Sequence, residues 1–251
     1  MNSFKGKVSI ITGAASGLGL GIASELSKLG SIVILLDIDN DRLLKAASEN
    51  MYGPFETKIV DVTNYESIEL TFNQIFGKYG HIDYLFNNAG IGGTLPFSEA
   101  TIKHWNKIIN LNMYGVINGM TAIYPIMKKQ QSGHIINTSS IGGIIPFSGQ
   151  ALYNTTKYAI AGLSLSLERE LKNDNIDISI ICPGMVNTRI FYKPIIGNEA
   201  PEEYVKIPKE AISVEHAVKD IINGIKRRKK IIITPSILKS FYLRYRLFGK
   251  Y

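Results

Sequence analysis

Short runs of apolar, β-branched residues alternate with longer segments of helical period along the 251-residue chain. The runs have the length and composition of buried strands, and they lie at 7–12, 31–37, 56–62, 82–88, 134–140, 176–182 and 230–235. Helical patterns lie between them, most clearly at 17–29, 64–79, 101–129, 153–172 and 213–228. Continuous apolar strands separated by helices are typical of a mostly parallel sheet that is covered on both faces.

This pattern continues almost from end to end, without a repeat, a low-complexity segment or a linker rich in proline, glycine and serine. We therefore expect one doubly wound α/β domain over residues 1–235 and a short C-terminal tail over 236–251. In such sheets, ligands bind beyond the carboxyl ends of the strands, where the strand order reverses. Motifs that carry chemistry should therefore lie at strand ends.

The first predicted strand ends in a glycine-rich turn, TGAASGLG at 12–19. Its first glycine permits a tight turn, the second lets the backbone approach a pyrophosphate at the helix N-terminus, and the third lets the helix lie close to the sheet. The strand before the turn and the helix after it favour a dinucleotide site over an ordinary strand-to-helix turn. The candidates for cofactor binding here are Gly13, Ser16, Gly17, Leu18 and Gly19.

Asp37, at the end of the second predicted strand, bears on the choice of dinucleotide. A carboxylate here can accept hydrogen bonds from both adenosine ribose hydroxyls, and it repels the 2′-phosphate of NADP. Ile38, Asp39 and Asn40 follow it, so no basic residue sits beside it in the sequence. The pattern favours NAD over NADP, while a helix cap or a loop carboxylate is the alternative role for Asp37.

Two further strand ends extend the predicted dinucleotide site. The third strand ends in Asp61 and Val62, which suit an adenine edge. The fourth ends in NNAG at 87–90, where small residues let the backbone approach a ligand closely. The candidates in this motif are Asn88, Ala89 and Gly90.

Two segments place a lysine four residues after a tyrosine: YNTTK at 153–157 and YPIMK at 124–128. Either spacing puts the pair on one helix face, so their surroundings must separate them. Ser140 lies at a predicted strand end upstream of Tyr153, whereas a proline follows Tyr124 directly within a helical stretch. We therefore predict that the first segment is catalytic and that the second ends a helix.

The residues around the first segment have the chemistry that carbonyl reduction needs. Tyr153 can give a proton to the substrate oxygen while hydride arrives at carbon, but tyrosine ordinarily has a pKa of about 10. We expect the ammonium of Lys157 to lower the pKa of Tyr153, and Lys157 can also bind the nicotinamide ribose. Ser140, at a strand end, can hold the substrate oxygen.

In this order, TGAASGLG, NNAG, a downstream serine, YNTTK and the PG of CPGMVNTR at 182–189 resemble the short-chain dehydrogenase/reductase family. The resemblance covers about residues 5–235. It implies a single Rossmann-type domain that moves hydride between nicotinamide and a carbonyl or alcohol, assembled as a homodimer or homotetramer. The family's catalytic set corresponds here to Asn112, Ser140, Tyr153 and Lys157.

The resemblance also assigns roles within that set. Asn112 would hold a water that links Lys157 to solvent, and Met113 stands where the family has leucine. Tyr153 and Lys157 would contact the cofactor as well as the substrate. The segment after the sixth strand would contact the nicotinamide carboxamide and the rest of the cofactor through Pro183, Gly184, Val186 and Thr188.

Segments 92–97, 141–147 and 185–195 are apolar and carry few charges. They favour a hydrophobic secondary alcohol or ketone as substrate, although the same residues also suit the core or a subunit contact. The loop at 190–210 suits a mobile lid. Two other functions stay open: an NADPH-dependent 3-oxoacyl or carbonyl reductase, which Asp37 argues against, and a non-catalytic dinucleotide sensor, which the complete catalytic set argues against.

Positive charge is concentrated in the last 26 residues, which carry nine of the 28 cations, and no acidic residue follows Asp220. The remaining 19 cations face 21 anions, so the body is slightly acidic and nucleic acid is an unsuitable partner. As a helix, the tail would place Ile237, Leu238, Phe241, Tyr245 and Phe248 on one face and Lys239, Arg246 and Lys250 on the other. Peripheral membrane contact and packing on a protein surface both remain open.

The remaining composition adds expectations about location and metals. Cys182 is the single cysteine, so no internal disulfide can form, which fits a reducing, cytoplasmic compartment. The four histidines share no ligand spacing, and we expect no metal site. The N-terminal segment lacks the apolar core of a secretory signal, and no apolar run is long enough to span a bilayer.

Overall fold

A parallel sheet of seven strands runs through the protein in the order β3-β2-β1-β4-β5-β6-β7. The computed structural model describes residues 4–192 and 207–249. The strands are β1 (Val8–Thr12), β2 (Ile32–Asp37), β3 (Phe55–Ile59), β4 (Tyr84–Asn87), β5 (Gly133–Thr138), β6 (Ile176–Pro183) and β7 (Ile231–Thr234). The strand order reverses between β1 and β4, so the doubly wound α/β prediction is confirmed.

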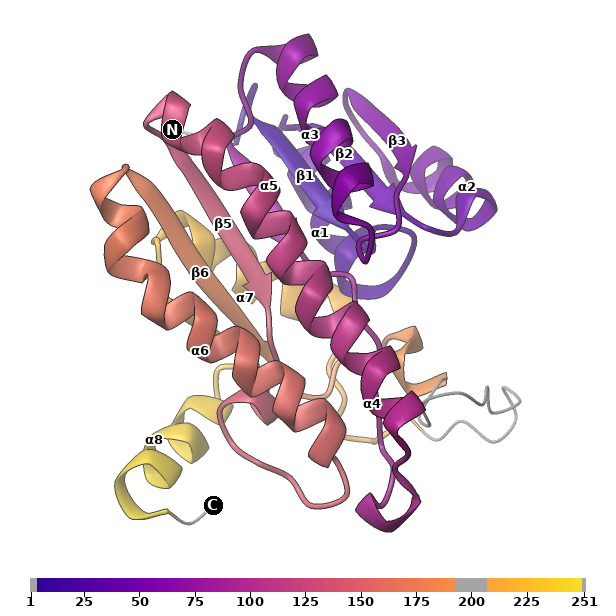
Figure 1. Cartoon of the computed structure of the whole chain (residues 1–251), viewed down its shortest axis with the longest axis vertical. Coiled ribbons are helices and arrows are strands. Elements are labelled where there is room, and N and C mark those ends of the chain that lie inside the picture. Colours follow the sequence, from indigo (N-terminus) through magenta and orange to yellow (C-terminus); the bar gives the residue numbers. More distant parts are fainter. Residues whose placement is uncertain (1–3, 193–206, 250–251) are drawn as a thin grey trace.

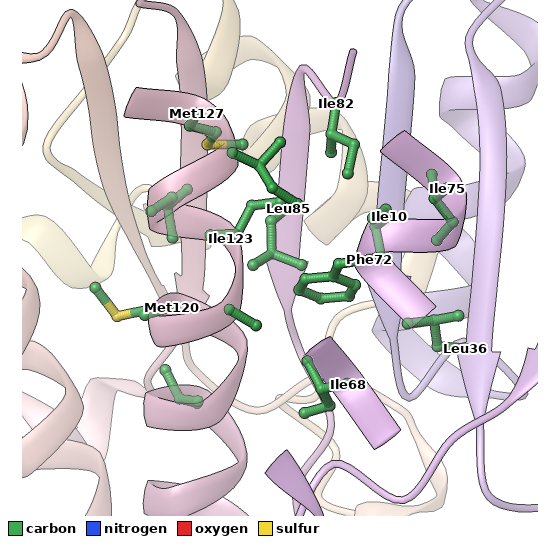
Figure 2. Packing of buried hydrophobic residues seen from close by; sticks show 14 of the residues in the cluster. Ile10, Leu36, Ile68, Phe72, Ile75, Ile82, Leu85, Met120, Ile123 and Met127 are labelled. Carbon is green, nitrogen blue, oxygen red and sulfur yellow. The ribbon is translucent and has the colours of Figure 1, made fainter. Parts of the chain in front are cut away.

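Helices cover both faces of the sheet (Figure 1). They are α1 (Gly17–Lys28), α2 (Asn40–Asn50), α3 (Tyr65–Tyr79), α4 (Ile102–Ile109), α5 (Gly115–Gln130), α6 (Ala151–Asn173), α7 (Val214–Lys226) and α8 (Leu238–Phe248). Successive residues of a strand face opposite layers: Ile10 packs in the cluster under α3, α5 and α6, and Ile11 packs in the cluster under α1, α2 and α7. Figure 2 shows the first cluster, where Phe72 of α3 and Ile123 of α5 meet around Leu85 of β4.

Two helical segments differ from the sequence prediction. The segment predicted as one helix at 101–129 is divided by a π-helical turn over Asn110–Tyr114 that lies between α4 and α5. Helix α2 was not among the helices predicted; Asp39 caps it by accepting a hydrogen bond from the Arg42 backbone N–H. Pro125 lies inside α5, which continues to Gln130.

The tail forms helix α8, which follows β7 closely and packs on the chain's own body. Leu238, Tyr242 and Tyr245 lie against a small buried cluster that includes Ile144, Ile180 and Ile233. The apolar residues predicted for one face of this helix have two environments, because Leu238 and Tyr245 pack inward whereas Ile237, Phe241 and Phe248 are exposed. No helix in the described part of the chain combines the length and apolarity that crossing a membrane requires.

A buried polar ladder of Asn87, Asn137 and Ser164 joins strands β4 and β5 to helix α6. Asn87 Nδ2 donates to Asn137 Oδ1 across 2.9 Å, and Asn137 Nδ2 donates to Ser164 Oγ of α6 across 3.0 Å. Gly119 of α5 covers the ladder so closely that a Cβ there would lie 2.2 Å from Asn87 Oδ1. Any larger side chain at position 119 would clash with this ladder, so the packing requires glycine there.

We expect Gly119→Ala to lower the free energy of unfolding by about 2–3 kcal/mol, because the added methyl displaces a buried, hydrogen-bonded amide. Gly162→Ala is the matched control, since nothing lies within 4 Å of a Cβ at that helical position. It should be neutral or stabilise the protein by up to about 1 kcal/mol through helix propensity. Chemical denaturation measures both, and equal effects of the two substitutions would contradict the packing argument.

Candidate active site

The ends of β1 and β4 are tied together at the point where the strand order reverses. Thr12 Oγ1 accepts hydrogen bonds from the backbone N–H groups of Asn88 and Ala89, both across 3.0 Å. Gly13 has φ of +65°, and a Cβ there would lie 2.8 Å from Ala89 Cα. The glycine turn and the NNAG segment therefore form one unit. Sequence reasoning gave Thr12 no role, although a threonine directly before the turn glycine is its signal.

The start of α1 is open to an anion. Ser16 is the N-cap residue, but its side chain makes no capping hydrogen bond, and the first turn contains no acidic residue. Gly17 has φ of +56°, and a Cβ there would lie 3.3 Å from Thr188 Cβ, while one at Gly19 would lie 2.2 Å from Gly13 O. The backbone N–H groups and the helix dipole at this end suit a pyrophosphate. The described residues thus fit the phosphates of a dinucleotide.

Asp37 lies beside this turn. Its carboxylate accepts hydrogen bonds from the Ala15 N–H across 3.0 Å and from the Asp39 N–H across 3.1 Å. Arg42, a basic residue in the first turn of α2, pairs with Asp39 at 3.5 Å. Asp37 therefore orders the glycine turn and the start of α2, and its negative charge sits next to the candidate phosphate site.

Asp61 and Val62, predicted to meet the adenine, have different surroundings. Asp61 Oδ1 accepts hydrogen bonds from the backbone N–H and the hydroxyl of Thr63, both across 2.8 Å. The Val62 side chain is buried in the core below Gly115, where a Cβ would lie 2.8 Å from Val62 Cγ2. Its carbonyl accepts from the Asn118 amide across 3.0 Å. Asp61 is exposed, and the side chain of Val62 is a core residue.

The NNAG segment connects the nucleotide end to the candidate catalytic group. Asn88 Oδ1 accepts a hydrogen bond from the Thr138 hydroxyl across 3.3 Å, which links β4 to β5. A Cβ at Gly90 would lie 3.0 Å from Asn112 Oδ1 and 3.6 Å from Lys157 Nζ. Glycine at this position lets the backbone run between the Asn112 and Lys157 side chains.

Lys157 lies at the centre of the candidate catalytic group and is only 4% exposed. Its ammonium donates to the Thr138 carbonyl at the end of β5 across 3.0 Å, and Nζ lies 5.6 Å from the centroid of the Tyr153 ring. Burial lowers the pKa of Lys157 to about 8. Lys157 can therefore exchange a proton near neutral pH, which an ordinary lysine does not.

The expected lowering of the Tyr153 pKa is wrong. Burial raises the pKa of Tyr153, and a hydrogen bond with Ser140 opposes that rise only in part. Lys157 is itself shifted towards its neutral form by burial, so it supplies less positive charge than an exposed ammonium would. Burial therefore holds Tyr153 as the neutral phenol, the form that can donate a proton.

Ser140 is fixed between two strand ends. It caps the short turn Ile141–Gly143 by accepting a hydrogen bond from the Gly142 N–H across 3.1 Å. Its hydroxyl also lies 3.5 Å from the Pro183 carbonyl at the end of β6. Gly184 follows, and its N–H donates to the Thr234 carbonyl across 2.7 Å. The predicted PG turn therefore lies directly beside the predicted catalytic serine.

Asn112 lies in the π-helical turn and is fully buried. Its amide makes a pair of hydrogen bonds with the Ile91 backbone, accepting from N–H across 2.8 Å and donating to C=O across 2.9 Å. It also donates to Thr156 Oγ1 of α6 across 3.3 Å. The side chain thus joins the segment after NNAG to the helix that carries Lys157.

Asn154 was missed from the sequence, where its only signal is its place directly after Tyr153. It is 7% exposed, and its amide donates to the Phe147 carbonyl across 2.8 Å. Its Oδ1 has no hydrogen-bond partner in the described part of the protein, and a Cβ at Gly142 would lie 2.8 Å from it. Asn154 therefore holds the loop after Ser140 against α6.

The rival pair, Tyr124 and Lys128, has a structural role. The Tyr124 hydroxyl donates to Asp174 Oδ2 across 2.7 Å, and Lys128 Nζ donates to the Tyr124 oxygen across 3.1 Å. These contacts join the end of α5 to the residue after α6. Helix α5 ends shortly before β5 begins, so the pair lies near the amino ends of the strands. The candidate catalytic group lies near their carboxyl ends.

The segments expected to cover the substrate divide into two kinds. Phe97, Met185 and Ile190 are 71%, 43% and 38% exposed, so they are available to contact a ligand. Ile144 and Ile145 are buried in the cluster beneath α8 and are core residues rather than substrate cover. Ile195 and most of the expected lid at 190–210 lie outside the described residues.

Comparisons with known proteins agree with this geometry. The family profile described as short chain dehydrogenase matches residues 7–194. An uncharacterized oxidoreductase of Staphylococcus saprophyticus is 32% identical over 241 residues, covering 95% of this chain and 98% of the relative.

Two solved structures share the fold. A short chain dehydrogenase/reductase from Burkholderia phymatum in complex with NAD has a TM-score of 0.88 at 24% identity, covering 100% of this chain and 98% of that one. A short-chain dehydrogenase from Sphingobium yanoikuyae in complex with NADPH has a TM-score of 0.83 at 24% identity, covering 97% and 94%. Both similarities are close enough to establish the fold, and the two structures are complexes with different nucleotides.

The burial of Lys157 predicts a pH dependence of stability. Its pKa is about 8 in the folded protein and returns to 10.5 on unfolding. Between these values the unfolded chain binds more protons, so the free energy of unfolding rises with pH. Relative to Lys157→Met, wild type should gain about 3 kcal/mol across this window. Denaturant titrations of both proteins at a series of pH values measure the difference, and a constant difference would show that Lys157 titrates normally.

Proposed function

This chain belongs to the short-chain dehydrogenase/reductase family, whose members are oxidoreductases, and we propose that it transfers hydride between NAD and a hydrophobic secondary alcohol or ketone. The observation that carries the proposal is the group formed by Ser140, Tyr153 and the buried Lys157 at the end of β5. The NNAG segment connects this group to the glycine turn that suits a pyrophosphate.

The proton chemistry follows from the state of the three side chains. In the reducing direction, the neutral Tyr153 hydroxyl gives its proton to the carbonyl oxygen, and Ser140 donates a hydrogen bond that holds this oxygen. In the oxidising direction, Tyr153 accepts the alcohol proton. Lys157, with its pKa near 8, replaces or removes the tyrosine proton and keeps hydrogen-bond donors for the ribose. Bound NAD supplies the carbon that takes or gives the hydride.

Asp37 supports NAD as the cofactor. Its carboxylate stands at the end of β2 beside the glycine turn, where a 2′-phosphate would meet a negative charge. Arg42, which could neutralise such a phosphate, pairs with Asp39 instead. The fold does not decide between NAD and NADP, because one similar structure holds NAD and another holds NADPH.

The exposed apolar side chains support a hydrophobic substrate. Phe97, Met185 and Ile190 lie on the segments that follow β4 and β6, and they carry no charge. A charged substrate would find no opposite charge among them, whereas an apolar alcohol or ketone would bury surface against them.

Phenylalanine substitutions of Tyr153 and of Tyr124 offer a matched test of the proposed chemistry. Tyr153→Phe should lower kcat at least about a thousandfold, because it removes the proton donor and acceptor. NAD affinity, measured by calorimetry, should change no more than about threefold, since the phosphate site is untouched. Tyr124→Phe removes the same atom from the rival pair and should leave kcat within about twofold. Equal activities of wild type and Tyr153→Phe, or NAD binding without any turnover by wild type, would refute the proposal.

Cofactor choice tests the role of Asp37. Initial rates on a panel of apolar secondary alcohols and ketones should be faster with NAD(H) than with NADP(H). Asp37→Ser should shift the ratio of kcat/KM values towards NADP(H) at least about tenfold, because it removes the repulsion of the 2′-phosphate. Asp41→Ser, which removes a nearby charge on the exposed side of α2, is the control and should not shift the ratio. A wild-type preference for NADP(H) would overturn the assignment.

A further inference from the structure

Helix α8 carries positive charge that no acidic side chain neutralises within residues 4–192 and 207–249. Between α7 and β7, Lys230 pairs with Glu168 at 2.8 Å and Arg228 pairs with Asp177. On α8, by contrast, Lys239, Arg244 and Arg246 form no ion pair with any acidic side chain among the described residues. No acidic residue follows Asp220 in the sequence, so the helix has none of its own.

The same helix exposes large apolar side chains. Leu238, Tyr242 and Tyr245 pack inward, and at about 100° per residue they occupy one side of the helix. The exposed apolar residues of residues 237–248 lie on the remaining surface and span an arc of about 160°. They are Ile237, Phe241, Leu243, Leu247 and Phe248, with exposures of 69%, 47%, 59%, 73% and 71%.

These exposed side chains stand out against the rest of the surface. Elsewhere, exposed large apolar residues are scattered over many elements, such as Leu44 on α2 and Leu70 on α3. On α8 they share one arc of the helix, with Lys239 and Arg246 beside one edge of this arc and Arg244 within it. A contiguous apolar surface with cations at its border marks an interaction site.

The position of α8 connects this surface to the candidate active site. The helix lies beyond the carboxyl ends of the strands, on the side where the loop after β5 also lies (Figure 1). Leu238 touches the PG turn, since a Cβ at Gly184 would lie 2.4 Å from Leu238 Cδ1. The inner face of α8 packs on the cluster that also holds Phe147 of the loop after Ser140.

We propose that α8 is a peripheral membrane-binding helix that seats the protein on an anionic lipid surface. The helix is about 16 Å long at ~1.5 Å per residue and can lie flat in the interface. The exposed apolar side chains enter the boundary between headgroups and acyl chains, and the lysine and arginines reach the headgroups. The membrane then faces the same side of the protein as the strand ends, where an apolar substrate would bind.

The positive charge of α8 favours a lipid surface, rather than a second copy of the chain, as the partner that covers this helix. Two copies that met through α8 across a two-fold axis would bring Lys239, Arg244 and Arg246 of each chain together. The tail offers no acidic residue to compensate them. Anionic headgroups supply the opposite charge and the adjoining acyl chains supply the apolar surface.

The test is co-sedimentation of the full-length protein with vesicles, which does not depend on the proposed activity. Wild type should bind vesicles of phosphatidylcholine mixed with phosphatidylglycerol, should bind pure phosphatidylcholine far less, and should dissociate as salt is raised. Lys239→Gln/Arg244→Gln/Arg246→Gln and Leu247→Gln/Phe248→Gln should each lower the partition coefficient at least about tenfold. Circular dichroism and thermal unfolding should show that both variants fold like wild type, because all five side chains are exposed.

Matched controls change the same kinds of residue elsewhere on the surface. Lys45→Gln/Lys172→Gln/Lys219→Gln removes three exposed charges outside α8, and Leu44→Gln/Leu70→Gln removes two exposed leucines. Both should bind vesicles like wild type. The proposal is overturned if wild type does not bind the anionic vesicles, or if the α8 variants bind as well as the controls. Failure to bind together with concentration-dependent self-association that Leu247→Gln/Phe248→Gln abolishes would assign the surface to a second copy instead.

Discussion

The close approach of β1 to the end of β4 is the constraint on which the whole site depends. The Thr12 hydroxyl binds two backbone N–H groups of the NNAG segment, and Gly13 leaves no room for a side chain against Ala89. This junction sets the helix N-terminus of α1 and the catalytic strand ends side by side at the reversal of strand order. Any side chain that separated the two strand ends would separate the nucleotide from the proton donor.

The burial of Lys157 is the basis of the chemistry that we propose for the site. Thr138 accepts one hydrogen bond from the Lys157 ammonium, and burial shifts the lysine towards neutrality while it holds Tyr153 as a phenol. Burying this charge costs the most stability below a pH of about 8, and the cost falls as the pH rises from there to 10.5. Functional sites often keep groups that lower stability in this way. A lysine with its ordinary pKa would give up and take back protons too rarely near neutral pH.

Sequence periodicity was sufficient to predict the sheet, because buried parallel strands are continuous apolar runs. The order of the motifs was sufficient to predict the family, and the surroundings of the two Tyr-Lys pairs distinguished YNTTK from a pair that only joins α5 to the end of α6. The hydrogen-bond pair that Asn112, in the π turn, makes with the Ile91 backbone was not predictable, because Ile91 is far from it in sequence. The direction of the Tyr153 pKa shift and the inner face of α8 likewise depend on burial, which spacing alone does not reveal.

We propose that hydride passes directly between a substrate carbon and the nicotinamide while Tyr153 gives or accepts the proton. An experiment with the best alcohol substrate, carrying deuterium on its carbinol carbon, follows the label by mass spectrometry. We expect one deuterium in each reduced nicotinamide formed and none lost to water. Reduced nicotinamide without the label, or label released to the solvent, would contradict it.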